Sequence, residues 1–253
     1  MKLKPLKGDA ILSAFADDGR LFLVIGDVHL GLTDRLGIRR PLPEEEALED
    51  CARLTTASSE TGANNLIVLG DIKHGLFEPS PYEKKALRAM TEELVKTFEV
   101  WIMKGNHDYG VEEVMDPRVR VIGKEGLELD RVAFIHGHSL PRLSQSIESY
   151  DGVVSGHLHP QLMLDGGWAP VWLKLMNRKR GRPREIVFLP HFNRYASRAG
   201  YQPGPPMTIA PFLNRLDINR YDFEMMDLEL HRVARGRASE VLFPKKGSGA
   251  GRI

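Results

Sequence analysis

Short apolar runs of strand length recur through the first 160 residues, and each is followed by glycine and a polar cluster. The runs occupy residues 21–25, 66–69, 100–103, 132–135 and 153–154. Their length and their β-branched residues are typical of buried strands. Apolar residues spaced three or four apart predict helices over 44–60 and 82–98, between the first three runs. This alternation of strand and helix predicts an α/β fold with at least partly parallel strands.

Composition excludes several other classes of protein. The chain has 253 residues, and 35 Lys and Arg against 34 Asp and Glu leave a net charge of +1. A single cysteine, Cys51, excludes an internal disulfide framework and fits a reducing compartment. Neither a targeting segment nor an apolar run near the roughly 20 residues needed to span a bilayer is visible. We therefore expect a soluble, cytoplasmic protein without a membrane partner.

The polar clusters carry side chains that bind metals. Ligands of α/β sheets bind at the carboxyl ends of strands, so these side chains should converge there. They comprise two carboxylates, one amide and four imidazoles: Asp27, His29, Asp71, Asn106, His136, His157 and His159. Oxygen donors mixed with imidazole suit Mn²⁺, Fe²⁺ or Zn²⁺. Seven ligands are too many for one ion, but they suit two ions about 3.5–4 Å apart if one carboxylate bridges them.

Spacing within two of the clusters supports this convergence. Asp27 and His29 are two residues apart, and so are His157 and His159. At an extended strand end, side chains two residues apart point to the same side. Each pair is therefore expected to face one site.

The order of the motifs resembles a known family. Gly26-Asp27-Val28-His29, Gly70-Asp71, Gly105-Asn106-His107-Asp108, His136-Gly137-His138 and Gly156-His157-Leu158-His159 follow one another as in the calcineurin-like metallophosphoesterases. The resemblance covers residues 21 to about 160 and continues more weakly to about 195. In detail, Lys73-His74 after Asp71 and the segment 189–193 resemble two narrower groups. These are the small archaeal phosphoesterases related to double-strand-break-repair nuclease subunits, and the bacterial ligase-associated phosphoesterases.

This resemblance implies a four-layer αββα sandwich with two central mixed sheets. Residues 1–234 would form the catalytic domain, and residues 235–253 a basic, Gly-rich tail that we expect to be frayed. One metal would be held by Asp27, His29 and His159, and the other by Asn106, His136 and His157, with Asp71 bridging them. His136 is preferred to His138 because it matches the family ligand.

The resemblance also implies hydrolysis of a phosphoester, more often a diester, by a hydroxide that bridges the two metals. Mn²⁺ is the expected ion, with Fe²⁺, Zn²⁺ or Ni²⁺ as alternatives. His107 would stabilise the phosphoryl oxygens and protonate the leaving oxygen. Asp108 would hydrogen-bond the His107 imidazole and fix its tautomer.

Several alternatives stay open at this point. The substrate could be a nucleic acid or a small phosphodiester, or the chain could be a non-catalytic interaction scaffold with the same fold. Residues 174–184 carry six basic side chains and no acid, so they could contact nucleic acid or form a solvated hairpin. Lys73, His74 and His138 could contact substrate or be structural. The oligomeric state is not determined by the sequence.

Overall fold

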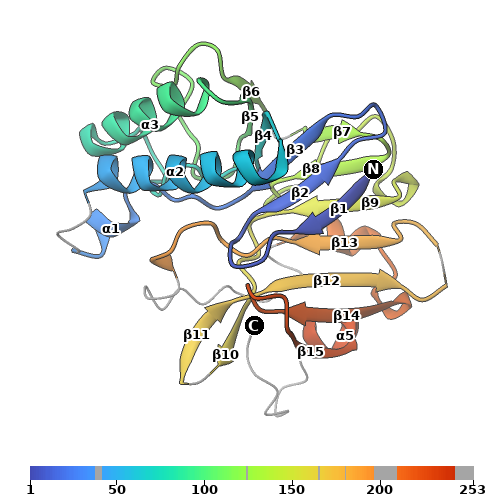
Figure 1. Ribbon diagram of the computed structural model, residues 1–253. Helices are drawn as coiled ribbons and strands as arrows, with labels where there is room; N and C mark the ends of the chain where they lie inside the picture. The colour runs from blue at the N-terminus through green and yellow to red at the C-terminus, as the bar shows by residue number, and fades with distance from the viewer. Residues whose placement is uncertain (38–41, 124, 165, 180, 197–209, 243–253) are drawn as a thin grey trace.

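Two mixed β-sheets stacked face to face form the centre of the computed structural model, which describes residues 1–37, 42–123, 125–164, 166–179, 181–196 and 210–242 (Figure 1). The first sheet has the order β1 (Lys2–Pro5), β2 (Leu12–Phe15), β3 (Leu21–Ile25), β4 (Asn65–Val68), β5 (Glu99–Met103), β6 (Arg120–Ile122). Strands β3 to β6 are parallel, whereas β1 and β2 are antiparallel. The strands predicted at residues 21–25, 66–69 and 100–103 are therefore present as β3, β4 and β5.

The second sheet has seven strands. Their order is β15 (Arg232–Arg237), β14 (Tyr221–Met226), β12 (Trp172–Asn177), β13 (Glu185–Phe188), β9 (Gly152–Ser155), β8 (Val132–Ile135), β7 (Leu127–Leu129). β8, β9 and β13 are parallel, and the other neighbours are antiparallel. A separate hairpin joins β10 (Gln161–Leu164) to β11 (Gly167–Pro170).

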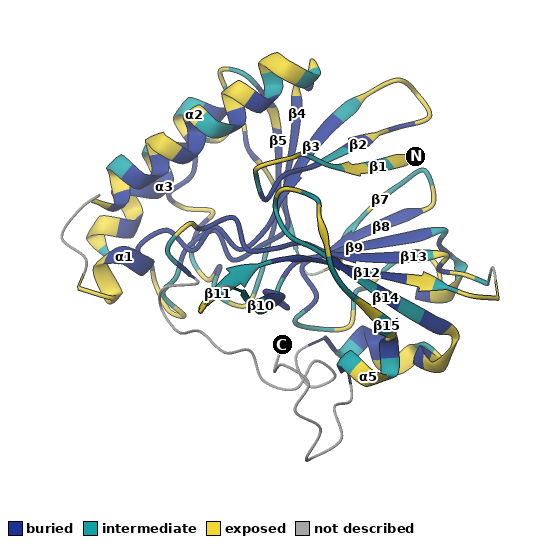
Figure 2. Cartoon of the chain, turned by 60° about the horizontal axis from the view of Figure 1, so that its bottom comes forward, coloured by how far each residue is buried: buried dark blue, intermediate teal, exposed yellow. Residues whose placement is uncertain are grey.

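Helices cover the outer face of the first sheet. They are α2 (Pro43–Thr61) and α3 (Pro81–Leu94), with the short α1 (Leu32–Arg35) beside them (Figure 2). Helix α3 begins at Pro81, one residue before the predicted start, and Ser80 and Glu83 form a capping box there. It ends at Leu94 rather than at residue 98, and buried Phe98 closes the following turn through a bond to the Leu94 carbonyl.

The apolar core has three layers of contact. One lies between α2, α3 and the first sheet, and another between the two sheets, where Phe22, Phe134 and Trp172 are fully buried. A third covers the outer face of the second sheet. These layers confirm the predicted α/β sandwich with two mixed sheets. Within the described residues, the layer outside the second sheet contains η1 (Ile147–Ser149), η3 (Pro211–Arg215), η4 (Ile218–Arg220) and α5 (Ala238–Leu242), three of which are 3₁₀ helices.

The expected tail boundary at residue 235 differs from the structure. Residues 235–237 complete β15, which pairs with β14, and residues 238–242 form α5. Ala238 and Leu242 are buried in the outer apolar layer, which explains why this basic segment is ordered. The remaining tail residues, 243–253, lie outside the described part of the chain. Across the described residues, no helix has the length and apolar character needed to cross a membrane.

Candidate metal centre

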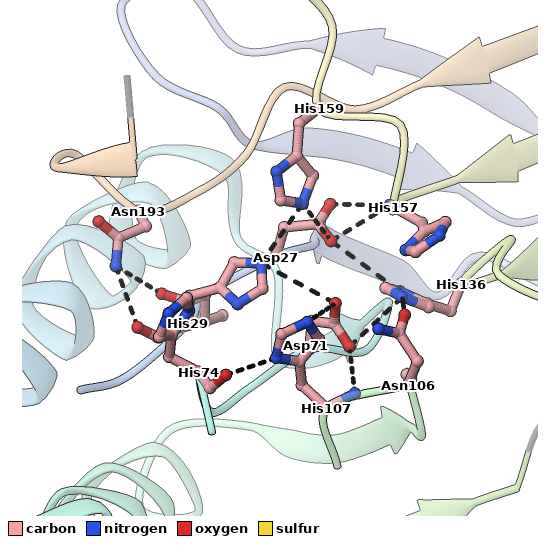
Figure 3. Close-up of polar contacts among 12 residues, drawn as sticks. Asp27, His29, Asp71, His74, Asn106, His107, His136, His157, His159 and Asn193 are labelled. Atoms are coloured by element: carbon pink, nitrogen blue, oxygen red, sulfur yellow. Dashed lines mark hydrogen bonds and ion pairs between the residues drawn. The ribbon is translucent and has the colours of Figure 1, made fainter. Parts of the chain in front are cut away.

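The candidate site lies where strands of both sheets end. β3, β4 and β5 are neighbours in the first sheet, and β8 and β9 are neighbours in the second. The segments that follow these five strands converge in one cluster, in which Asp27, Asp71 and His136 are buried and Asn106 is exposed (Figure 3). The structure brings together all seven residues singled out as ligands: Asp27, His29, Asp71, Asn106, His136, His157 and His159.

The backbone that carries these side chains is unusual. The φ angle is 59° at Asp27, 49° at His29, 49° at Asp71, 65° at His157 and 46° at His159. Residues with a side chain rarely adopt such left-handed conformations, although Asp and His tolerate them better than most. Each costs on the order of 1–3 kcal/mol and clusters of them mark functional sites. The explanation from an extended strand end was therefore wrong, because each pair converges through left-handed turns.

Glycine and backbone hydrogen bonds let the two sheets approach closely here. A Cβ atom on Gly70, where φ is 78°, would lie 2.6 Å from Nδ1 of His136 and 2.7 Å from the Gly105 nitrogen. The Asp27 amide donates to the Gly70 carbonyl at 3.1 Å, and the His29 amide donates to the Asp71 carbonyl at 2.8 Å. The loops after β3 and β4 thus continue the pairing of their strands and hold their side chains in register.

The first group of donors contains Asp27, His29 and His159. Nε2 of His159 lies 2.9 Å from Oδ1 of Asp27 and 3.4 Å from Nε2 of His29. The Asp27 carboxylate also accepts the amide of His157 on both oxygens, at 3.1 and 2.9 Å. Candidate ligand atoms of the three residues all lie within 4.8 Å of one another.

The second group contains Asp71, His136 and His157, whose candidate ligand atoms also lie within 4.8 Å. Nε2 of His136 is 3.3 Å from the Asn106 amide oxygen. Nδ1 of His136 donates to the Leu69 carbonyl at 2.6 Å, which turns Nε2 toward the cluster.

The Asp71 carboxylate lies between the two groups. Its Oδ1 is 3.4 Å from Nε2 of His136, whereas its Oδ2 is 3.9 Å from Nε2 of His29. Oδ1 also accepts the His107 amide at 2.9 Å, which fixes the orientation of the carboxylate.

Burial and neighbouring charges set the protonation of these groups. Burial opposes ionisation of Asp27, but His159 and His136 outweigh it and lower the pKa of this carboxyl to about 2. Burial lowers the pKa of His157 to about 3. Burial also disfavours a charged His136, yet Asp71 and Asp27 raise its pKa to about 9. The site therefore combines anionic carboxylates with a neutral imidazole and a positive charge on His136.

This donor set fits divalent metal ions. The Nε2 atoms of His29 and His159 face each other beside a carboxylate, and such lone pairs repel unless a proton or a cation lies among them. Nδ1 of His29 is buried and has no hydrogen-bond partner among the described residues. Imidazole and carboxylate together suit first-row divalent ions.

His107 borders the cluster, but its expected partner was wrong. Both oxygens of fully buried Asp108 accept backbone amides, Oδ1 from Ile72 at 2.9 Å and Oδ2 from Gly105 at 2.8 Å. The tight 105–108 turn directs this carboxylate into the loops, away from the imidazole. Nδ1 of His107 instead donates to the His74 carbonyl at 2.5 Å. His107 Nε2 then lies 3.8 Å from Asp71 Oδ2.

His74 is the residue that sequence reasoning left open and the structure brings in. Its ring stacks on His107 with centroids 5.7 Å apart. Burial and the neighbouring His107 lower the pKa of His74. His29, His74 and His107 form a third group of convergent nitrogens. The position of His74, three residues after Asp71, is the sequence signal for this placement.

Lys73 has a structural role in the described chain. Its side chain is fully buried, and its ammonium donates to the carbonyls of Gly75, Phe77 and His107. The ammonium points into the loops and not toward the candidate metal ligands. The structure therefore favours a structural role for Lys73 over contact with a substrate phosphate. Lys73 ties the 71–78 loop to the 105–108 turn.

Asn193 and Glu46 fix the other side of the site. The Asn193 amide donates to the carbonyls of Val28 and His29 at 2.8 and 3.3 Å, and to Oε1 of Glu46 at 2.9 Å. Oε2 of Glu46 accepts the Thr33 hydroxyl at 2.9 Å. Sequence reasoning missed Glu46, although an acid on the apolar face of α2 was a usable signal.

Arg53 anchors this network to the first sheet. Its guanidinium lies over the Phe192 ring at 3.7 Å, donates to the Phe192 carbonyl and pairs with Asp9 and Asp50. His191, beside this segment, directs Nδ1 to the Asn193 carbonyl at 2.7 Å. His138 lies within the histidine cluster, with its ring centroid 5.2 Å from that of His136.

The basic run 174–184 lies away from the candidate site. Its hairpin joins the carboxyl end of β12 to the amino end of β13, whereas the site lies beyond the carboxyl end of the parallel neighbour β9. Lys174 pairs with Glu185, Arg178 with Asp222, and Arg182 and Arg184 with Asp151. Arg180 lies outside the described residues. The described part of the run is an ion-paired hairpin. This favours a solvated hairpin over a surface that contacts nucleic acid.

Replacing Lys73 tests its structural role. Lys73→Met leaves three part-buried carbonyls without their donor, so we expect a loss of unfolding free energy on the order of 2 kcal/mol. Urea unfolding measures this loss. Lys104→Met, which removes a half-buried lysine paired with Glu112, is the matched control and should cost less than about 1 kcal/mol. Equal effects of the two substitutions would contradict the role of Lys73.

Glu46 should make stability depend on pH. Burial raises its pKa from 4.5 to about 7. The pKa of Glu46 is higher in the folded than in the unfolded chain. Its contribution to the free energy of unfolding is therefore full below pH 4.5 and is lost as the pH rises through 7. The loss can reach about 3 kcal/mol. The free energy of unfolding of Glu46→Gln should fall less from pH 5 to pH 8 than that of the parent. Urea unfolding in EDTA measures both. Exposed Glu60→Gln, on the same helix, should keep the parent's dependence of stability on pH. If Glu46→Gln also kept it, the assignment to Glu46 would be wrong.

Comparison with known proteins places this geometry in a family. The family model for calcineurin-like phosphoesterases matches residues 20–222. No curated protein matches the chain at a significant level. Among solved structures, Pseudomonas putida nuclease MPE is similar with a TM-score of 0.52 and 18% identity, covering 90% of this chain and 98% of that one.

Two further solved structures are more distant. The phosphoesterase YfcE from E. coli has a TM-score of 0.41 and 16% identity, covering 86% of this chain and 98% of its own. An archaeal phosphodiesterase has a TM-score of 0.31 and 14% identity, covering 66% and 98%. With the family model matched over most of its length, this chain belongs to the calcineurin-like phosphoesterases, metal-dependent hydrolases of phosphoester bonds that use a dinuclear divalent metal centre.

Proposed function

We propose that this protein hydrolyses phosphodiesters with two divalent metal ions. Asp27, His29 and His159 would hold one ion, and Asn106, His136 and His157 the other, with Asp71 bridging. The observation that carries this proposal is the position of Asp71, because its two oxygens face different histidine groups, 3.4 Å from His136 and 3.9 Å from His29. A carboxylate so placed is the bridge that a two-metal centre needs.

Metal ions bound there would polarise the phosphoryl oxygens and lower the pKa of a coordinated water. His107 supplies the acid–base group of the chain itself. Its Nδ1 is held by the His74 carbonyl, so Nε2 is the nitrogen that can carry a proton toward a phosphoryl or leaving oxygen. Asp108 does not contact the imidazole but positions it indirectly. Its carboxylate accepts the amides of Ile72 and Gly105 and so joins the loop after β4 to the 105–108 turn that carries His107.

Manganese is the ion that the donor set favours. Four imidazoles bind Mn²⁺ more strongly than Mg²⁺, which prefers oxygen ligands and keeps several waters. Fe²⁺, Zn²⁺ and Ni²⁺ are alternatives that accept the same nitrogen donors. The proposed substrate is a nucleic acid or a small phosphodiester. The similar protein MPE from Pseudomonas putida is a nuclease, which supports a phosphodiester substrate for the same fold.

Chelation and one substitution test this proposal together. Hydrolysis of bis-p-nitrophenyl phosphate should disappear in EDTA and return with Mn²⁺ better than with Mg²⁺. His107→Gln should retain both metals by elemental analysis but lower kcat by roughly 10²–10⁴, the range for a positioned acid–base group. His231→Gln, a substitution of an exposed histidine in the β14–β15 turn, is the matched control and should keep the parent's kcat.

Three outcomes would contradict the proposal. Full hydrolysis after exhaustive chelation would exclude the two-metal centre as the source of activity. If His107→Gln loses its metals, His107 is a ligand in the third nitrogen group and not the acid–base group. Failure of the metal-loaded parent to hydrolyse diesters or monoesters would favour the non-catalytic scaffold.

A further inference from the structure

A cavity of about 410 Å³ opens beside the candidate metal centre, on the side of His74 and His107. These two histidines form part of its wall. The loop 75–80 and the first turn of α3 also line the cavity, with Leu76, Phe77 and Tyr82 among their residues. Its volume lies in the range of roughly 300–1,000 Å³ that small-molecule sites occupy. His74 and His107 line this cavity and also belong, with His29, to one group of convergent nitrogens, so the cavity adjoins the candidate metal centre.

The cavity wall exposes apolar and aromatic side chains that the fold does not use. Phe77 is 81% exposed, Tyr82 57% and Leu76 55%. Leaving such side chains in water forgoes the free energy that burying them would gain. Exposed apolar side chains grouped at a cavity mark a surface that binds something.

The loop that carries Phe77 is fixed from two sides. The buried Lys73 ammonium binds the carbonyls of Gly75 and Phe77. Glu83 of α3 accepts the amides of Gly75 and Ser80, at 2.7 and 2.8 Å. The exposed ring therefore projects from a constrained backbone, and a preorganised aromatic surface loses little entropy when a ligand stacks on it.

Charge at the cavity limits what can enter. Of the residues that the structure describes, three carboxylates line it, those of Asp34, Glu78 and Glu83, together with the guanidinium of Arg35. Three carboxylates disfavour a second phosphate in this space. A neutral, planar ring suits the aromatic wall, because every nucleobase has a face that stacks on an aromatic side chain.

We propose that this cavity binds the nucleobase attached to the scissile phosphodiester, with Phe77 as its stacking surface. This inference rests on the proposed function and adds the class of substrate: a diester with a nucleotide on the side of His107. Phe77 would then determine specificity without taking part in the chemistry.

Four dinucleotides with one phosphodiester each provide the test: both bases present, the base missing on the 5′ side, the base missing on the 3′ side, and both bases missing. Phe77→Ala should reduce the preference for a base on one side of the phosphate by roughly 10-fold, expressed mainly in KM. Phe77→Trp should restore that preference. The matched control is Phe15→Ala, which removes an exposed phenylalanine paired with Leu21, at the end of β3 opposite to the site. Phe15→Ala should hydrolyse all four substrates with the same KM and kcat as the parent.

A binding measurement separates this inference from the proposed function. 2-Aminopurine deoxyribonucleoside 5′-monophosphate in EDTA reports stacking through fluorescence quenching, without turnover. The parent and Phe15→Ala should quench it saturably, and Phe77→Ala should not. If the parent hydrolyses dinucleotides but Phe77→Ala keeps both the base preference and the quenching, the base site is wrong and the proposed function stands. If the parent quenches the probe yet hydrolyses no diester, the base site stands and the proposed function fails.

Discussion

Two buried carboxylates, Asp27 and Asp71, set the requirement that the rest of the structure meets. Both are almost inaccessible to solvent. A buried charge costs several kcal/mol unless opposite charge lies beside it. Among the surrounding imidazoles His136 supplies that charge, because Asp71 and Asp27 raise its pKa to about 9. Two divalent cations would supply it more completely and release the imidazoles to act as ligands.

The need to bring these groups together explains the unusual backbone. Asp27, His29 and Asp71 carry left-handed φ angles that are costly in isolation. The surrounding structure supports them, through amide–carbonyl pairs between the loops after β3 and β4 and through Asn193 on the far side. Lys73 and Asp108 do the same for the loops that carry Asp71 and His107. Buried polar groups outside the ligand set thus hold the ligands in place.

Much of the fold and of the candidate site could be predicted from the sequence, because each candidate ligand lies within a few residues of the end of a strand. The buried strands follow from short apolar runs, and the two long helices follow from apolar residues spaced three or four apart. The seven convergent residues follow from the polar clusters that come after the apolar runs. Partners fixed by tertiary contacts could not be predicted in this way. Asp108 turns into backbone amides instead of reaching His107, Lys73 is buried, and the basic run meets the distant acids Asp151 and Asp222. Each depends on loops that meet only in the folded chain.

The central claim is that Asp71 bridges two metal ions held by residues from both sheets. The most direct test counts the ions bound per chain, by equilibrium dialysis against Mn²⁺ followed by elemental analysis, for the parent and for Asp71→Asn. The account predicts two ions for the parent and a clear loss of occupancy for Asp71→Asn, with the fold retained by circular dichroism. A parent that binds one ion or none, or an Asp71→Asn variant that still binds two with unchanged affinity, would contradict it.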